Sequence, residues 1–234
     1  MERLDKIIAS QTIYSRKDVK LLVRQKRVLV NDQLINKSDI KINPDTDEII
    51  IDGNLLTLKK NIYLILNKPK GYVSATEDAN QPTVLELVPA EYSHRELFPA
   101  GRLDKDTTGL MIITDDGQFA HDILSPKKHV TKTYRVKIDT PMTNDMVDGF
   151  KNGVELIDGV CKGAKLEIIG EKEGIVTLTE GRYHQIKRMF GCFKAKVEEL
   201  ERLSMGNLYL PSNLSQGSCR ELTDEELQQI KSEK

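Results

Sequence analysis

Residues 98–121 read FPAGRLDKDTTGLMIITDDGQFAH. Positions 101 to 109 of this stretch hold two glycines, one arginine, two aspartates and two threonines. The apolar run 110–113 predicts a buried strand, and Asp115-Asp116-Gly117 predicts a turn that caps a helix starting near Gln118. A dense polar loop joined to a buried strand is typical of a functional site that a rigid scaffold holds in place.

Two chemistries that use such a loop fit its surroundings poorly. A phosphotransferase of the haloacid dehalogenase type uses a D-x-D-x-T loop, which 104–108 approaches. That loop should leave an apolar strand, whereas Pro-Ala-Gly-Arg precedes Asp104. A calcium loop would use Asp104, Asp106 and Thr108, but the flanks lack a helical pattern and the twelfth position is Asp115 instead of Glu.

The loop resembles the GRLD-x-x-(S/T)-x-GL loop of pseudouridine synthases. Two further motifs of that family follow in the expected order, KTYRV at 132–136 and EGRYHQIKRMF at 180–190. The segments GRLDKDTTGL, TDDGQ, SPKKH and EGRYHQIKRM are most similar to those of the RsuA branch, which modifies small-subunit rRNA. The resemblance is weakest at about 140–170. It implies an α/β (α+β) core with a mixed, largely antiparallel sheet and a central cleft.

The resemblance also implies roles for individual residues around an extruded uridine. Asp104 is the implied catalytic carboxylate, either as a nucleophile or by removing a ribose proton, and Lys187 is its basic partner. Tyr134 is implied to stack on the uracil and to act as a base. Arg102 would stack in the space that the base leaves, although an ion pair that braces the loop is the open alternative. Further substrate-binding positions are Ile186, as an apolar platform, and Arg182.

Pseudouridine formation cuts the N1–C1′ bond of uridine and rejoins the uracil to the same ribose through C5. Because nothing is oxidised and no group is donated, we expect neither a cofactor nor a metal. The sequence has no GxGxxG, no P-loop and no metal-ligand spacing. Its three cysteines, Cys161, Cys192 and Cys219, are far apart and are expected to be free thiols.

The first sixty residues predict a separate small domain. Apolar residues at positions 4, 7 and 8 indicate a short helix, and Ser15 with Asp18 forms a capping box that begins a second. VLVNDQLI at 28–35 predicts a hairpin that turns at Asn31-Asp32. RLDKIIA and SRKDVKLLVRQKRVLVNDQLI resemble the S4 RNA-binding module. We therefore expect an S4-like domain at 1–58, a linker at 59–61 and a catalytic domain at 62–234.

Charge is distributed unevenly along the chain. The formal net charge is −1, but residues 1–30 hold eight Lys and Arg against three acids. The spacing of Lys17, Lys20, Arg24 and Arg27 predicts one basic stripe on the second helix, with Arg16 beside its first turn. Such a stripe suits RNA phosphates, and a solvated helix face is the alternative. Lys68 and Lys70, in a predicted turn after the strand 62–66, have the same two interpretations.

The leading hypothesis is therefore isomerisation of one uridine in 16S rRNA, with ribosomal RNA in a partly assembled small subunit as partner. The same reaction on 23S rRNA is one alternative, and a non-catalytic RNA-binding assembly factor is another. The chain lacks an apolar run of membrane-spanning length and a signal-peptide core, so we expect a cytoplasmic protein with no membrane association. Nothing in the sequence demands more than a monomer.

Overall fold

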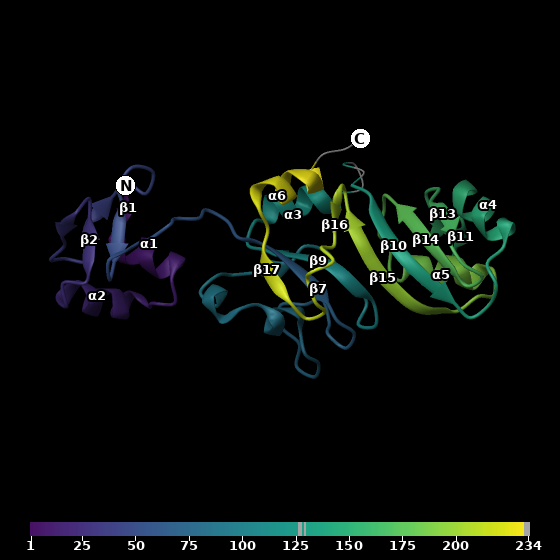
Figure 1. Ribbon diagram of the computed structural model, residues 1–234, viewed down its shortest axis with the longest axis horizontal. Coiled ribbons are helices and arrows are strands. Elements are labelled where there is room, and N and C mark those ends of the chain that lie inside the picture. Colours follow the sequence, from purple (N-terminus) through teal and green to yellow (C-terminus); the bar gives the residue numbers. More distant parts are fainter. Residues whose placement is uncertain (126–127, 129, 232–234) are drawn as a thin grey trace. The chain divides into compact units, whose positions relative to one another are not determined.

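A computed structural model describes residues 1–125, 128 and 130–231 (Figure 1). Part of the SPKKH motif, namely 126, 127 and 129, lies outside the described residues, as do 232–234. The chain forms two compact units, Met1–Ile62 with Val88–Glu96, and Tyr63–Leu87 with Leu97–Lys234. The finer ranges 1–58, 59–61 and 62–234 stay predictions.

The first unit packs two helices against small sheets. Helix α1 spans Leu4–Gln11 and α2 spans Arg16–Arg24. Strand β1 (Glu2–Arg3) pairs with β4 (Lys41–Ile42), and a four-stranded sheet has the order β3-β2-β5-β6. Its strands are β2 (Val28–Val30), β3 (Gln33–Leu34), β5 (Ile49–Ile51) and β6 (Asn54–Leu55). The apolar faces of both helices form one core with residues of β2, β4 and β5.

Local predictions in this unit are confirmed. Ser15 caps α2, and the reciprocal bond from Asp18 completes the capping box. The hairpin turns at Asn31 and Asp32, whose φ angles of 50° and 61° are those that a two-residue turn requires. The short 3₁₀ helix η2 (Ala90–Tyr92) also belongs to this unit, where Arg95 donates to the Lys59 carbonyl at 2.6 Å.

The prediction that Arg27 belongs to the basic stripe of the second helix is wrong. Helix α2 ends at Arg24, and the chain turns through Lys26, which has a φ of 59°. Arg27 therefore lies beyond the helix, and its guanidinium pairs with Asp52 at 2.6 Å. The basic side chains that α2 itself carries are Arg16, Lys17, Lys20 and Arg24.

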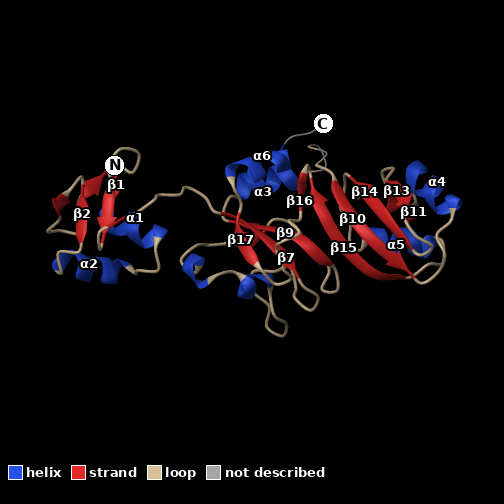
Figure 2. Cartoon of the chain, viewed as in Figure 1, coloured by secondary structure: helices blue, strands red, loops and turns tan. Residues whose placement is uncertain are grey.

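The second unit is built on a nine-stranded sheet (Figure 2). Its order is β13-β14-β10-β15-β9-β7-β17, with β16 paired to β15 and β8 paired to β9. The strands are β7 (Tyr63–Lys68), β8 (Phe98–Pro99), β9 (Thr108–Thr114), β10 (Lys132–Ile138), β13 (Lys165–Ile168), β14 (Glu173–Leu178), β15 (Val197–Met205), β16 (Leu208–Tyr209) and β17 (Cys219–Glu221). All its pairings are antiparallel except β15 with β9. The predicted mixed, largely antiparallel sheet is confirmed.

Helices and a small hairpin complete this unit. They are η1 (Val84–Leu87), α3 (Gly117–Leu124), α4 (Asn144–Asn152), α5 (Gln185–Cys192), α6 (Asp224–Lys231) and the hairpin β11 (Glu155–Leu156) to β12 (Gly159–Val160). Helices α3 and α6 lie together on one side of the sheet (Figure 1), where Ile123 and Ile230 share a core with Leu110 and Ile112 of β9. Asp116 caps α3 as predicted. No helix within the described residues is both long and apolar enough to cross a bilayer.

The parallel contact between β9 and β15 is short and close. It pairs Thr108 with Glu201 and Gly109 with Arg202. Gly109 has a φ of +100°, and a Cβ built there would lie 2.3 Å from the Arg202 carbonyl oxygen. Only glycine suits this position, since both the backbone conformation and the available space exclude a side chain. The polar loop before β9 is thereby held directly beside β15.

Candidate active site

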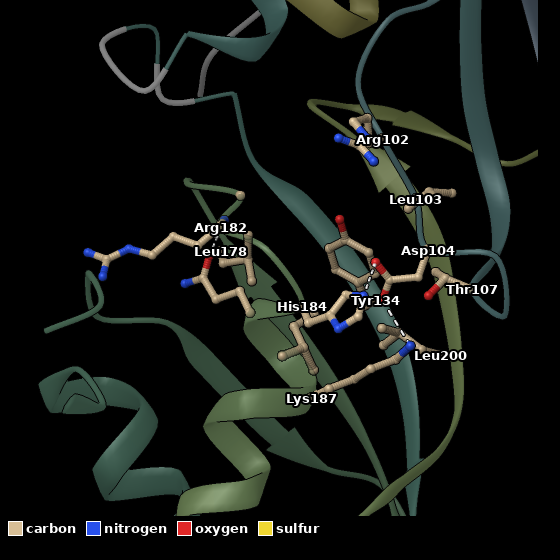
Figure 3. A pocket seen from close by; sticks show the side chains of 13 residues that line it. Arg102, Leu103, Asp104, Thr107, Tyr134, Leu178, Arg182, His184, Lys187 and Leu200 are labelled. Atoms are coloured by element: carbon tan, nitrogen blue, oxygen red, sulfur yellow. Dashed lines mark hydrogen bonds and ion pairs between the residues drawn. The ribbon is translucent and has the colours of Figure 1, made fainter. Parts of the chain in front are cut away.

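A pocket opens where the loop before β9 meets β10, β14, β15 and the start of α5 (Figure 3). These segments are distant in sequence and become neighbours through the central strands of the sheet. The pocket is lined by Arg102, Leu103, Asp104, Thr107, Tyr134, Leu178, Gly181, Arg182, His184, Gln185, Ile186, Lys187 and Leu200. All six residues that the sequence singled out for catalysis or substrate binding thus border one pocket.

Asp104 presents its carboxylate to two basic side chains. Its Oδ2 lies 2.9 Å from Lys187 Nζ, and its Oδ1 lies 3.4 Å from His184 Nε2. The side chain is 24% exposed, so the carboxylate is sheltered but still open to the pocket. Figure 3 shows the three groups converging from the loop and from the start of α5.

Lys187 also contacts a second carboxylate. Its Nζ donates to Asp106 Oδ1 at 2.6 Å, although Asp106 is much more exposed than Asp104. Burial lowers the pKa of Lys187, but the hydrogen bonds and charges of Asp106 and Asp104 outweigh burial and raise it above its usual value. Burial raises the pKa of Asp106, and the bond and charge of Lys187 reverse this, so its pKa is lowered. The lysine is therefore charged at neutral pH.

Lys68 holds the Asp104 loop through hydrogen bonds to its backbone carbonyls. The sequence predicted that Lys68 either contacts RNA or lies in a surface turn. Both predictions are wrong, because Lys68 is the last residue of β7 and is fully buried. Its Nζ donates to the carbonyls of Asp104 at 3.1 Å and Thr107 at 2.8 Å, and to those of Pro69 and Lys105. Burial lowers the pKa of Lys68 to about 8, and the charges of Asp106 and Asp104 limit that decrease.

One side of the pocket is apolar. Tyr134 of β10 and Ile186 of α5 are buried, and Leu178 and Leu200 complete the same wall. A planar heterocycle could lie against these side chains while its sugar faces Asp104. Within the described residues, no group of three or more His, Cys, Asp or Glu side chains is arranged to hold a metal ion.

Residues 62–191 match the family model described as RNA pseudouridylate synthase. The chain belongs to this family. A further match, to the S4 domain, covers residues 2–48. The family assignment agrees with the resemblance that the loop and the two later motifs indicated, and the chain is a pseudouridine synthase.

Full-length relatives of this pseudouridine synthase are known. An uncharacterized RNA pseudouridine synthase of Bacillus subtilis is 43% identical over 96% of each chain. The ribosomal small subunit pseudouridine synthase A of Escherichia coli is 41% identical over 97% of this chain and 99% of its own. A crystal structure of a pseudouridylate synthase superposes with a TM-score of 0.69 at 36% identity, covering 98% of this chain and 100% of that one.

The two arginines assigned to substrate binding differ in their surroundings. Arg102 is exposed at the pocket rim and makes no ion pair within the described part of the synthase, which disfavours the loop-bracing alternative. The guanidinium of Arg182 extends away from Asp104 (Figure 3). It donates to the carbonyls of Gly159 at 2.9 Å and Val160 at 2.6 Å. Arg182 therefore lines the pocket while its guanidinium is held by the β11–β12 hairpin.

Sequence reasoning missed two contacts of the site. The loop sequence by itself suggests that Asp106 bonds only to the backbone of its own loop, whereas the carboxylate pairs with Lys187 from α5. For His184 the sequence suggests a phosphate contact, a helix cap or a solvent-facing position, whereas the imidazole lies beside Asp104. The only available signal was their position within two family motifs, since a contact between distant segments has no local pattern.

The basic residues of the first unit differ in whether they form ion pairs. Lys17, Lys20 and Arg24 are exposed and make no ion pair with any described residue. Arg16 donates to the buried carboxylate of Asp5 at 3.2 Å. A hollow on this unit is lined by Arg3, Asp5, Arg16, Lys20, Val23, Arg24, Asn36, Lys37, Ser38 and Asp39. Several basic side chains of the predicted RNA-binding set thus border one concave surface.

Proposed function

We propose that this synthase converts one uridine of 16S rRNA to pseudouridine, with Asp104 acting at the ribose. The observation that carries the proposal is the sheltered Asp104 carboxylate, which faces Lys187 and His184 in a pocket with an apolar wall. The charged lysine compensates the negative charge of this partly buried carboxylate. An ionised carboxylate is what attack on C1′, or removal of a ribose proton, requires.

The other pocket residues suit the remaining steps. In this proposal Tyr134 stacks on the turned uracil and acts as the base that removes the C5 proton after the new bond forms, while Ile186 supports the ring; both residues line the pocket. Extrusion of the uridine costs about a few kcal/mol in lost stacking. Arg102, free at the rim, offsets this cost when its planar guanidinium stacks in the vacated space.

The substrate proposal rests on relatives and on charge. The Escherichia coli and Yersinia pestis relatives, 41% and 40% identical, are both named ribosomal small subunit pseudouridine synthase A. The match to the S4 domain and the exposed basic side chains of α2 support binding to RNA phosphates. We further propose that the synthase acts as a monomer in the cytoplasm, on rRNA in a partly assembled small subunit.

The test compares Asp104→Asn with Asp106→Asn on a 16S transcript and on partly assembled small subunits. Both variants remove a carboxylate that contacts Lys187, but only Asp104 lines the pocket. We expect Asp104→Asn to reduce turnover to background with RNA affinity little changed, and Asp106→Asn to keep measurable turnover. Full function in Asp104→Asn would indicate instead a non-catalytic assembly factor. Pseudouridine is detected by position-specific mapping.

A deletion strain separates the two possible rRNA substrates. We expect one pseudouridine to disappear from 16S rRNA and to return when the wild-type gene is restored. Loss confined to 23S rRNA would refute the 16S proposal while leaving the chemistry of the pocket intact.

A further inference from the structure

Two aromatic rings form a stack that leads from the pocket wall to solvent. The rings of Tyr183 and His184 have centroids 3.8 Å apart and planes inclined by 18°. His184 lines the pocket, where its Nε2 lies beside Asp104, and Tyr183 stacks on one face of the imidazole. Tyr183 is 73% exposed, although an aromatic ring of this size is usually at least half buried in a protein that lacks a partner.

The backbone makes this stack possible. Successive side chains of an extended segment point to opposite sides, so neighbouring rings do not normally lie face to face. His184 instead has the left-handed conformation, with a φ of 47° and a ψ of 34°, immediately before α5. A non-glycine residue adopts this conformation at some cost, and such residues concentrate at functional sites.

The segment that carries the stack is fixed on both sides. Arg188 donates to the Tyr183 carbonyl at 3.1 Å and pairs with Asp158. Arg182, the preceding residue, donates to the carbonyls of Gly159 and Val160. Both arginines therefore tie residues 182–184 to the β11–β12 hairpin. A partner that binds the exposed ring would meet a surface already ordered, which reduces the entropic cost of binding.

We propose that the exposed face of Tyr183 stacks on a nucleobase next to the target uridine. This inference rests on the proposed action on RNA and adds a binding contact outside the pocket. Once the uridine has been extruded, its neighbours on the strand are unstacked and present open π-faces at the pocket mouth. Aromatic side chains bind such bases with little sequence preference, and Tyr183 is the ring that continues outward from the pocket wall.

The absence of tryptophan from the chain provides a direct optical test. Tyr183→Trp introduces a single indole at the proposed contact, and Tyr209→Trp introduces one at another exposed tyrosine that does not line the pocket. Both substitutions are made in the full-length Asp104→Asn protein, so that the 16S transcript is bound without turnover. We expect saturable fluorescence quenching at position 183 and none at 209. Bound transcript without quenching at position 183 would overturn the inference.

Kinetics of the otherwise wild-type enzyme provide the second measurement. Tyr183→Ser should raise KM for the transcript about tenfold, with kcat within about twofold, whereas Tyr183→Phe and Tyr209→Ser should leave KM unchanged. An unchanged KM in Tyr183→Ser would also refute the stack. Pseudouridine formation without quenching at position 183 would refute the stack alone. Quenching without pseudouridine formation by the wild type would support the stack and refute the proposed substrate.

Discussion

Lys187 Nζ lies 2.9 Å from Asp104 Oδ2 and 2.6 Å from Asp106 Oδ1, so one ammonium group serves two carboxylates. The two aspartates belong to the same loop and the lysine belongs to α5, which follows in the chain after four strands of the sheet, β9, β10, β13 and β14. The two aspartates place two negative charges close together, and the ammonium group of Lys187 offsets their repulsion. Its removal should therefore have an electrostatic effect as well as a structural one.

Lys187→Met should lower turnover. It removes the ammonium group that lies 2.9 Å from the Asp104 carboxylate and leaves that partly buried charge without its lysine partner. We expect kcat at pH 7 to fall at least about tenfold. Lys187→Arg, which keeps a positive charge at this position, should recover most of the loss. A kcat of Lys187→Met close to that of the wild type would contradict a role of this charge in catalysis.

Lys132→Met should stabilise the fold at neutral pH. Burial, together with the charge of Arg202, lowers the pKa of Lys132 to about 8 from 10.5. The unfolded chain therefore binds a proton more tightly than the folded one, and burying the charged lysine costs stability below pH 8. This cost disappears as the pH rises from 8 to 10.5, so wild-type stability increases across that window. We expect a gain on the order of 2 kcal/mol at pH 7 for the variant, which shrinks at pH 10.

Denaturant unfolding of both proteins at the two pH values provides the measurement. Lys137→Met is the control, because Lys137 lies on the same strand β10 with a side chain that is 41% exposed. It should show little gain at either pH. An equal gain from Lys132→Met at pH 7 and pH 10 would mean that the buried charge is not the cause.

Gly109→Ala should destabilise the second unit severely. The new Cβ would lie 2.3 Å from the Arg202 carbonyl oxygen and 2.8 Å from its nitrogen, in a backbone with a φ of +100°. Because the obstacle is main chain, β9 and β15 would have to separate, and we expect a loss of more than about 3 kcal/mol in the free energy of unfolding. Gly117→Ala is the control, since nothing lies within 4 Å of the added Cβ. Equal thermal stability of the two variants would contradict the close approach of the strands.

Salt dependence of RNA binding should distinguish the cations of the first unit. Lys17→Gln, Lys20→Gln and Arg24→Gln should each flatten the log–log slope of affinity against salt by roughly one unit, as expected for lost phosphate contacts. Arg27→Gln should change the slope less, because Arg27 is paired with Asp52. Wild-type slopes in the three α2 variants would mean that this face of the helix is only solvated.

Features encoded by neighbouring residues were predictable from the sequence. The capping box of Ser15 and Asp18 and the Asp116 cap of α3 each depend on side chains within three residues of the backbone groups that they satisfy. The turn at Asn31 and Asp32 depends on two adjacent residues of types that tolerate a positive φ. The strand at 110–113 follows from its apolar run, and it extends over β9 (Thr108–Thr114). The motif resemblance supplied the family, the sheet class and six of the residues that line the pocket.

Only the tertiary structure decided which distant groups meet. Arg27 leaves the helical stripe because the chain turns after Arg24, and it pairs with Asp52, 25 residues away. Lys68 is buried because β9 and its loop cover it, and Asp106 reaches Lys187 across 81 residues. The stack of Tyr183 on His184 forms at a residue with a left-handed backbone. Local patterns reflect the hydrogen bonds and apolar faces of one segment, whereas these contacts arise from the packing of several segments, which no single stretch of sequence encodes.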